Sequence, residues 1–554
     1  MAKLKSITIK NYRSIGEKPV TITFPENQPV ILIGENNSGK TNIIRAIDIM
    51  FGEWHPKYRE FEDHDYFGRQ VDSDKKITIE TEVSGFLNKL GRYEGYTCSG
   101  FKLEAKKGKQ NHFVAIQSED GKENQYVSNK LREELSSVLI SSEQNLNYQL
   151  SYSSKYTLLS KVTKAFHNKL SDDENRISRL KKLYQQILNI FDEVKEFRDF
   201  KDKMSSITGD FIQNMTHGLQ LDFSAYDPSN YYKNLRVLPH ENGESRNFEE
   251  LGTGQQQILA LSFAHAYAKC FKNERGLILI IDEPEAHLHP LAQKWLARTL
   301  YQMAKDGLQM VITTHSPYFI DLEFLECIYL VRKNNRITSV TRIKRDEFAE
   351  YCKKHGADKS DENTIIPFYV KSATSNILKG LFAKKVVLVE GPTEELTLPI
   401  YLEKVGLDVL KEGIDIISVG GKGELAKWWR FFTAYKIPCY ICFDNDAKDD
   451  GRGNKRKDFL KTIGLDDDDQ EDILQTNDWL ITDKYCVFGK DFEETFRNSF
   501  STYQDIEEKI KNELGDSKPL VAREVAKTIC NENYNEIDVG WDNLTKIAHK
   551  IKIL

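Results

Sequence analysis

The chain has 554 residues, of which 40% are hydrophobic and 29% are charged, with a formal net charge of -6. This length exceeds one hydrophobic core and predicts roughly two to four domains. The charge balance excludes a uniformly basic surface, so any DNA binding has to come from local basic patches. No apolar run approaches the roughly 18 residues of a membrane span. The start runs directly into a strand without a signal peptide, and the 8 cysteines are scattered, which predicts a reducing cytoplasm.

Predicted strands and helices alternate along most of the chain. The apolar run 30–33 is typical of a buried strand, and residues 75–150 hold alternating segments that predict a β lobe covering the first sheet. Strand and helix alternation returns over residues 245–345. A second α/β unit is expected over residues 385–496, followed by a small helical tail.

The region 160–215 is charged and is predicted to be helical. Its apolar residues recur at a three-four spacing typical of a helix-pairing seam. The seam comprises Ile177, Leu180, Tyr184, Ile187, Phe191 and Val194. This spacing predicts either a dimerisation surface or a helix packed on the chain's own core, and the spacing alone does not decide between them.

A phosphate-binding loop is predicted at residues 34–41, which match G-x-x-x-x-G-K-[ST] between a strand and a helix. The glycines let the backbone wrap the phosphates, and amides at the helix start bind the anion. Lys40 is expected on the β and γ phosphates, and Thr41 on Mg²⁺. The expected nucleotide-binding residues of this loop are Gly34, Asn36, Asn37, Gly39, Lys40 and Thr41.

Three further segments complete an ATPase signature. The apolar strand 277–281 ends in Asp282, expected near Mg²⁺, and Glu283, expected to polarise the attacking water. Residues 251–256 resemble the signature motif of ABC-type ATPases but depart from its common Leu-Ser-Gly-Gly-Gln form. The residues that this motif predicts as nucleotide contacts are Gly252, Gly254 and Gln255. His315 follows a strand and resembles the switch histidine of the same ATPases.

Residues 7–15 resemble the first strand and turn of the RecF and SMC group. In that group the signature loop of one subunit completes the ATP site of another. The resemblance therefore implies a dimer or an ATP-stabilised closed state, and the expected assembly is a homodimer or a higher homo-oligomer.

Carboxylates end two apolar runs of the second half. Glu390 follows residues 386–389 and Asp444 follows residues 440–443. Open α/β sheets place their chemistry at such strand ends, and clustered carboxylates hold Mg²⁺ or Mn²⁺. The predicted ligands in this half are Glu390, Glu394, Asp444, Asp446 and Glu493. The alternative is that these are ordinary strand-end acids at helix N-termini.

Two lysines accompany the carboxylates. Lys422 follows the glycines 420–421 and is a candidate contact for DNA phosphate. Lys518 opens a helix near the C-terminus. Beside a metal pair, this lysine would neutralise the negative charge that develops on the leaving oxygen. The alternative is that Lys518 is an ordinary solvated surface lysine.

The second half resembles a Toprim domain, through E-G-x-x-E at Glu390 and D-x-D at Asp444. An ABC-type ATPase followed by Toprim resembles the OLD (overcoming lysogenization defect) family, which includes the ATPase subunit of Gabija anti-phage systems. The resemblance implies DNA cleavage with two divalent metals, a catalytic role for Lys518, and a function in phage defence. It also implies that a helicase or a reverse transcriptase is a candidate partner.

The resulting prediction is an α/β chain with a RecF/SMC-like ATPase domain, a helical insertion, a Toprim domain and a helical extension. The expected bounds are 1–160 and 236–370 for the ATPase, 161–235 for the insertion, 371–500 for Toprim, and 501–554 for the extension.

The predicted function is an ATP-regulated, Mg²⁺- or Mn²⁺-dependent DNA endonuclease. One alternative is a DNA-clamping repair ATPase whose Toprim domain only binds, which the intact carboxylate set disfavours. Another is strand passage of the topoisomerase type, which needs a nucleophilic tyrosine in a separate domain.

Overall fold

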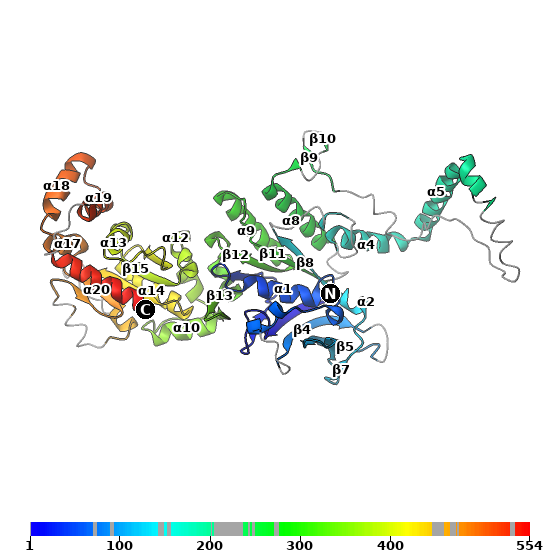
Figure 1. Cartoon of the computed structure of the whole chain (residues 1–554), viewed down its shortest axis with the longest axis horizontal. Coiled ribbons are helices and arrows are strands. Elements are labelled where there is room, and N and C mark those ends of the chain that lie inside the picture. The colour runs from blue at the N-terminus through cyan, green and yellow to red at the C-terminus, as the bar shows by residue number, and fades with distance from the viewer. Residues whose placement is uncertain are drawn as a thin grey trace.

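The computed structural model describes most of the chain. The described residues are 2–69, 75–88, 93–141, 149–151, 157–200, 202–203, 237–241, 244–245, 250–270, 276–445, 459–465, 473, 476–531 and 538–554. Figure 1 shows these residues as an elongated molecule. A central sheet with the N-terminus lies between a second α/β unit, which carries the C-terminus, and a projecting pair of helices.

The central sheet contains the predicted phosphate-binding strand β3. Its strands are parallel except for β14, which is antiparallel to β13. In spatial order they are β14 (Ile337–Arg342), β13 (Ile328–Asn334), β3 (Val30–Ile33), β12 (Gln309–Thr314), β11 (Gly276–Asp282) and β8 (Leu135–Ser141). The strand β8 lies within the region 75–150 that was expected to form only a covering lobe. That expectation is wrong for β8, because its apolar run pairs in parallel with β11.

An antiparallel lobe covers one face of this sheet, as the alternating sequence predicts. Its strands in spatial order are β2 (Val20–Thr23), β1 (Lys3–Lys10), β4 (Ile77–Leu87), β5 (Thr97–Ala105), β6 (His112–Gln117) and β7 (Glu123–Asn124). Alternate side chains such as Ile79 and Leu103 point inward and join Leu32 and Ile280 of the central sheet in one buried cluster.

Two helices, α4 (Leu158–Ser171) and α5 (Glu174–Asp192), project from the central sheet (Figure 1). Asp173 caps α5 by accepting from the amides of Asn175 and Arg176. Three members of the predicted apolar seam are exposed, with Ile187 at 41%, Phe191 at 44% and Val194 at 49%. Packing on the chain's own core therefore does not hold for these three residues. Much of the predicted insertion, from residue 204 to residue 236, lies outside the described residues.

The second α/β unit is a parallel sheet with one antiparallel edge strand. Its spatial order is β16 (Ile414–Ser418), β15 (Lys385–Val389), β17 (Cys439–Asp444), β19 (Tyr485–Phe488) and β18 (Leu480–Ile481). Helices follow the strands and form the C-terminal part: α13 (Pro392–Lys404), α14 (Lys422–Ala434), α17 (Phe492–Ser499), α18 (Tyr503–Leu514), α19 (Lys518–Asn531) and α20 (Val539–Ile553).

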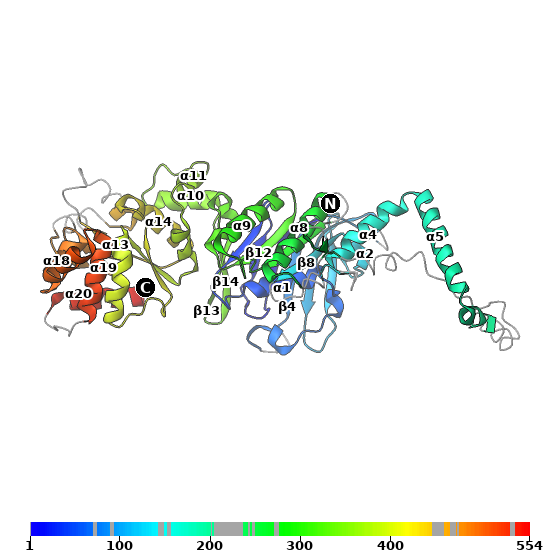
Figure 2. The same ribbon diagram turned by 90° about the horizontal axis from the view of Figure 1, so that it is seen from above.

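The two units share a hydrophobic core. One continuous cluster of buried side chains runs from Ile312 of the central sheet, through Phe348 and Tyr369, to Leu388 and Trp428 of the second unit. Phe348 and Tyr369 lie on α10 (Arg345–Lys354) and α11 (Ile365–Val370), which lie between the two sheets in Figure 2. The two units are therefore packed against each other through buried side chains. Among the described residues, no helix is long and apolar enough to cross a membrane.

Candidate nucleotide site and carboxylate site

The loop between β3 and α1 (Lys40–Phe51) is held against β13 and β14 by close backbone contacts. Gly34 has a φ of 145°, and a Cβ there would lie 2.1 Å from the carbonyl oxygen of Val331. Gly39 has a φ of 112°, and its Cβ would lie 2.3 Å from Oγ1 of Thr338. Thr338 also donates to the carbonyl of Ser38 at 2.8 Å. Only glycine fits these two positions, so the neighbouring strands fix the shape of the loop.

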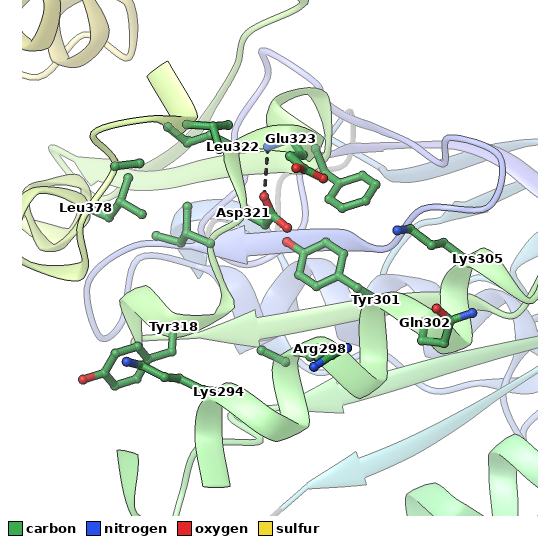
Figure 3. Close-up of a pocket in the computed structure, with 15 residues that line it drawn as sticks. Lys294, Arg298, Tyr301, Gln302, Lys305, Tyr318, Asp321, Leu322, Glu323 and Leu378 are labelled. Atoms are coloured by element: carbon green, nitrogen blue, oxygen red, sulfur yellow. Dashed lines mark hydrogen bonds between the residues drawn. The ribbon is translucent and has the colours of Figure 1, made fainter. Parts of the chain in front are cut away.

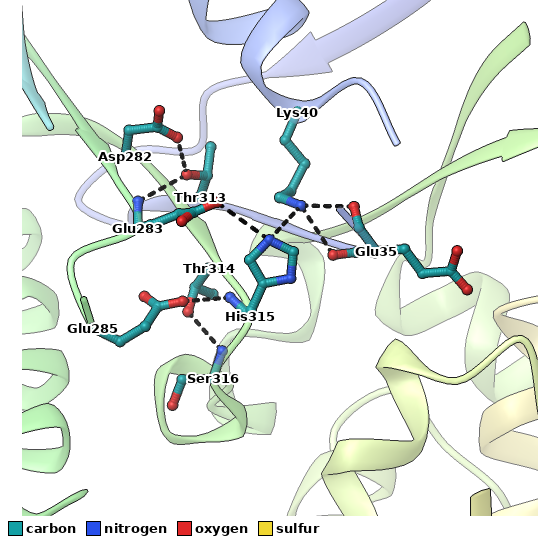
Figure 4. A network of polar contacts seen from close by, with 10 residues as sticks. Glu35, Lys40, Asp282, Glu283, Glu285, Thr313, Thr314, His315 and Ser316 are labelled. Atoms are coloured by element: carbon teal, nitrogen blue, oxygen red, sulfur yellow. Dashed lines mark hydrogen bonds and ion pairs between the residues drawn. The ribbon is translucent and has the colours of Figure 1, made fainter. Parts of the chain in front are cut away.

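Lys40 lies at the centre of a polar network (Figure 4). Its Nζ donates to the carbonyls of Gly34 and Glu35 at 2.9 Å each and lies 2.9 Å from Nε2 of His315. Burial lowers the pKa of Lys40 to about 8, against the opposing effect of Glu283 and other acids. Burial and then the charge of Lys40 lower the pKa of His315. A neutral imidazole is therefore favoured beside the lysine.

The end of β11 joins the same network. The hydroxyl of Thr313 donates to Oδ1 of Asp282 at 2.5 Å and accepts from the amide of Glu283 at 3.0 Å. Glu283 has a φ of 49°, and its Oε1 lies 3.3 Å from Nε2 of His315. Oε1 of Glu285 accepts from the amide of His315 at 2.5 Å. The structure thus brings Lys40, Asp282, Glu283 and His315 together at the ends of neighbouring strands.

The other predicted nucleotide contacts fall into two groups, one in the phosphate-binding loop and one in the signature segment. Asn36, Asn37 and Thr41 are exposed, which leaves them accessible from solvent. The signature segment 252–255 begins α8 (Thr253–Cys270), and a Cβ at Gly254 would meet Leu288 and His287 first. This segment therefore packs on the loop after β11.

The carboxylate site lies where β15 and β17 end. These strands are parallel neighbours, with Val389 opposite Cys442. The amide of Asp444 donates to Oε1 of Glu390 at 2.8 Å. Nζ of Lys422, a buried residue at the start of α14, lies 3.6 Å from the same oxygen. The strand ends are therefore joined directly, and Lys422 faces the carboxylate of Glu390. Its contact with DNA phosphate stays a prediction.

Glu394 lies in the first turn of α13, which begins at Pro392. Its Oε2 accepts from the amide of Gly391 at 3.2 Å. Burial first, and then the neighbouring carboxylates of Glu390 and Glu493, raise the pKa of Glu394 to about 7. Glu493 lies in the first turn of α17. The like charges of these three residues therefore act on one another.

The donor set suits a hard divalent cation, because the residues supply carboxylate oxygens. A cation would also relieve the repulsion that raises the pKa of Glu394. Within the described ranges, however, no three acidic, histidine or cysteine side chains are grouped closely enough to hold a metal ion. Glu390 accepts from the amide of Asp444, and Glu394 accepts from the amide of Gly391. Asp446 lies outside the described residues, and Lys518 is exposed at the start of α19.

Two family models match the chain. Residues 30–321 match a family model whose description reads AAA domain, AbiEii toxin, Type IV TA system. Residues 381–446 match the TOPRIM domain of overcoming lysogenization defect protein-like (OLD-like) proteins.

The chain carries an AAA ATPase domain followed by an OLD-like TOPRIM domain and is homologous to OLD nucleases.

Two curated relatives match most of the chain. The chain is 25% identical to the OLD nuclease of Thermus scotoductus over 80% of this chain and 82% of that protein. It is 23% identical to the endonuclease GajA of Bacillus cereus (strain VD045) over 76% of this chain and 71% of that protein. Among solved structures, the Smc head domain of Pyrococcus furiosus covers 62% of this chain and 96% of its own at 16% identity, with a TM-score of 0.35.

Several residues that shape the nucleotide site were not predicted from the sequence. Thr313 orients Asp282, and Glu285 holds the backbone of His315. Thr313 lies two residues before His315, and Glu285 lies two residues after Glu283. This closeness to the predicted residues is the sequence signal that could have identified them. Thr338 fixes the phosphate-binding loop from β14. No local pattern marks Thr338, because its role arises from strand packing across 300 residues of sequence.

Proposed function

We propose that this chain is an ATP-regulated, divalent-metal-dependent DNA endonuclease that hydrolyses phosphodiester bonds at the carboxylate site. The observation that carries this proposal is the 2.8 Å contact between the Asp444 amide and Glu390, which joins two strand-end carboxylates at one sheet edge. The OLD-like TOPRIM match and the similarity to proteins named OLD nuclease and endonuclease GajA support the same reaction class.

The proposed roles divide among the chain's own residues. Glu390 and Asp444 hold the cations, and Glu394 and Glu493 complete the ligand set with Asp446. When bound, Mg²⁺ or Mn²⁺ activates water and stabilises the leaving 3′-oxygen. Lys422 balances the charge of Glu390. Lys518 neutralises charge on the leaving group when DNA brings it to the site.

In the ATPase half, Glu283 polarises the attacking water, Asp282 and Thr41 hold Mg²⁺, and His315 senses the γ-phosphate. Lys40 donates to the carbonyls of Gly34 and Glu35. It has to exchange these carbonyls for phosphate oxygens when nucleotide binds. The shared core then carries the resulting loop change toward β15 and Glu390. This is the proposed basis of regulation by ATP.

A homodimer completes the ATP site in this proposal, with the segment 252–255 of one subunit facing the phosphates held by the other. The exposed apolar residues of α5 supply a contact surface between subunits. The proposed setting is the cytoplasm and phage defence, as the resemblance to Gabija anti-phage systems implies. A helicase or a reverse transcriptase is the proposed partner class.

A plasmid cleavage assay tests the proposal. Supercoiled plasmid is incubated with the purified chain and Mg²⁺ or Mn²⁺, with and without ATP, and with EDTA as the control. Nicked or linear plasmid is expected with metal and none with EDTA. Intact plasmid under every condition, together with retarded migration of bound DNA in a gel, would instead establish the DNA-clamping alternative.

A further inference from the structure

A pocket of about 490 Å³ lies apart from both sites described above, at the junction of the ATPase and TOPRIM units (Figure 3). Its walls are α9 (Pro290–Lys305), the short helices η5 (Pro317–Phe319) and η6 (Leu322–Cys327), and residues of α11 and α12 (Ser375–Leu378). This volume falls within the roughly 300–1,000 Å³ typical of small-molecule sites.

One wall is cationic. Lys294, Arg298 and Lys305 are exposed along the side of α9 that faces the pocket. The amine of Lys294 lies 4.9 Å from the ring centre of Tyr318, and that of Lys305 lies 5.3 Å from the ring centre of Phe324. Throughout the described ranges, none of the three cations forms an ion pair within 4.0 Å. Their charge is therefore available to an anionic ligand.

The pocket also contains aromatic rings, two of them in contact with the cations, and the acidic residues Asp321 and Glu323. The rings of Tyr301 and Phe324 are stacked, with centroids 4.8 Å apart. The hydroxyl of Tyr301 donates to the carbonyl of Phe319 at 3.1 Å, which fixes that ring. Asp321 is half-buried, and its Oδ1 accepts from the amide of Glu323 at 2.9 Å. Figure 3 shows Asp321 and Tyr301 side by side in the pocket.

We propose that this pocket binds a phosphorylated nucleoside, at a site separate from the phosphate-binding loop. Lys294, Arg298 and Lys305 contact the phosphates, since cations form the strongest hydrogen bonds to such groups. The aromatic side chains pack against the base. Asp321 accepts hydrogen bonds from sugar hydroxyls, as acidic residues do in other nucleotide sites.

The location gives this ligand a regulatory role. Tyr318 stands three residues after His315, so a bound ligand contacts the segment that leaves the ATP site. Val370 and Leu378 line the same pocket and lead to β15, which ends at Glu390. A nucleotide in the pocket therefore touches both the switch segment and the connection to the carboxylate site.

Equilibrium dialysis with radiolabelled ADP tests the proposal on the full chain. Lys40→Ala removes binding at the phosphate-binding loop, so this variant isolates the pocket. We expect the Lys40→Ala chain to retain about one ADP per chain at saturation. Adding Lys294→Ala and Arg298→Ala, both at exposed positions, should weaken the retained binding by about tenfold or more. Adding Lys509→Ala, an exposed lysine on α18, is the matched control and should change nothing.

Competition experiments identify which part of the ligand is recognised. Unlabelled ADP should displace the label from the Lys40→Ala chain at least tenfold better than adenosine or pyrophosphate does, about the loss expected when half of the contacts are missing. A Lys40→Ala chain that binds no ADP would overturn the proposal. Equal displacement by pyrophosphate would overturn recognition of the nucleoside. Stronger displacement by oligothymidylate than by ADP would assign the pocket to a nucleic-acid strand instead.

Discussion

The two sites of this chain are assembled to different degrees. In the ATP site, Lys40 and His315 already interact at 2.9 Å, and Thr313 ties Asp282 to Glu283. In the carboxylate site, Glu390 accepts from the amide of Asp444 and pairs with Lys422, while Glu394 accepts from the amide of Gly391 at the start of its own helix.

The difference follows from how each site neutralises its charge. The ATP site contains both cationic and anionic side chains, whose opposite charges compensate one another. The carboxylate site contains mainly anions, with Lys422 as the cation beside Glu390. Acidic side chains of like charge separate until a cation compensates them, so the second site is expected to close on metal binding.

Asp444→Ala gives the largest expected effect. It removes a ligand from the cations, so DNA cleavage should fall by on the order of 10³-fold or more. ATP hydrolysis should stay within about twofold, because the ATP site shares no residue with Asp444. Plasmid cleavage and phosphate release, measured on the same preparation, check the expected loss of DNA cleavage and the expected retention of ATP hydrolysis. Asp542→Ala, at an exposed position of α20, is the control.

Glu283→Gln tests the ATP site, which is the more fully assembled of the two sites. The amide keeps the size of the side chain but removes the base that polarises water, so ATP hydrolysis should fall by about 10²-fold or more. Nucleotide binding should persist, because Lys40 and the loop glycines are unchanged. Rapid phosphate release by this variant would show that another residue activates the water.

Charge on the α5 helix tests whether the ATP site needs a second subunit. Ile187→Glu combined with Ile190→Glu places charge on residues that are 41% and 62% exposed. The dimer should dissociate in sedimentation velocity experiments, and ATP hydrolysis should fall by about tenfold, equivalent to about 1.4 kcal/mol. Lys182→Glu, at an exposed polar position of the same helix, should leave the dimer intact. A double variant that remains dimeric would remove α5 from the interface.

Glu507→Gln has the smallest expected effect and probes the helix that carries Glu493. Glu507 accepts from Arg497 at 2.6 and 2.9 Å and pairs with Lys511 at 2.8 Å, linking α17 to α18. Arg497 first, and then Lys511, hold the pKa of Glu507 at about 2, below its usual 4.5. The folded carboxyl binds its proton less readily than the unfolded one. Its contribution to stability is therefore full above about pH 4.5 and is lost as pH falls through about 2.

At pH 7 the substitution should lower the free energy of unfolding by about 2 kcal/mol, after allowance for the partial exposure of Arg497. The deficit should shrink as pH falls below about 4.5. Urea unfolding of the wild type and the variant, at pH 7 and in mild acid, measures this difference in the free energy of unfolding. A deficit that is independent of pH would show that packing, and not charge, links the two helices.

The sequence predicted most of the ATP site because its motifs are local. Lys40, Asp282 and His315 each follow an apolar strand, and adjacent strands bring such ends together. The same rule placed Glu390 beside Asp444. The sequence did not predict the role of Thr338 or the pairing of Lys422 with Glu390, because both depend on tertiary packing of distant segments. The inclusion of β8 in the central sheet was missed because an apolar run does not reveal which sheet it joins.

Titration of the nucleotide-free chain with Mn²⁺ tests the central claim most directly, because it reports on the carboxylate site before any DNA is added. Wild type should bind Mn²⁺, and Asp444→Ala should bind it at least about tenfold more weakly, the loss expected when one carboxylate ligand is removed. Equal Mn²⁺ binding by the two proteins, with equal plasmid cleavage, would contradict a metal site built on Glu390 and Asp444.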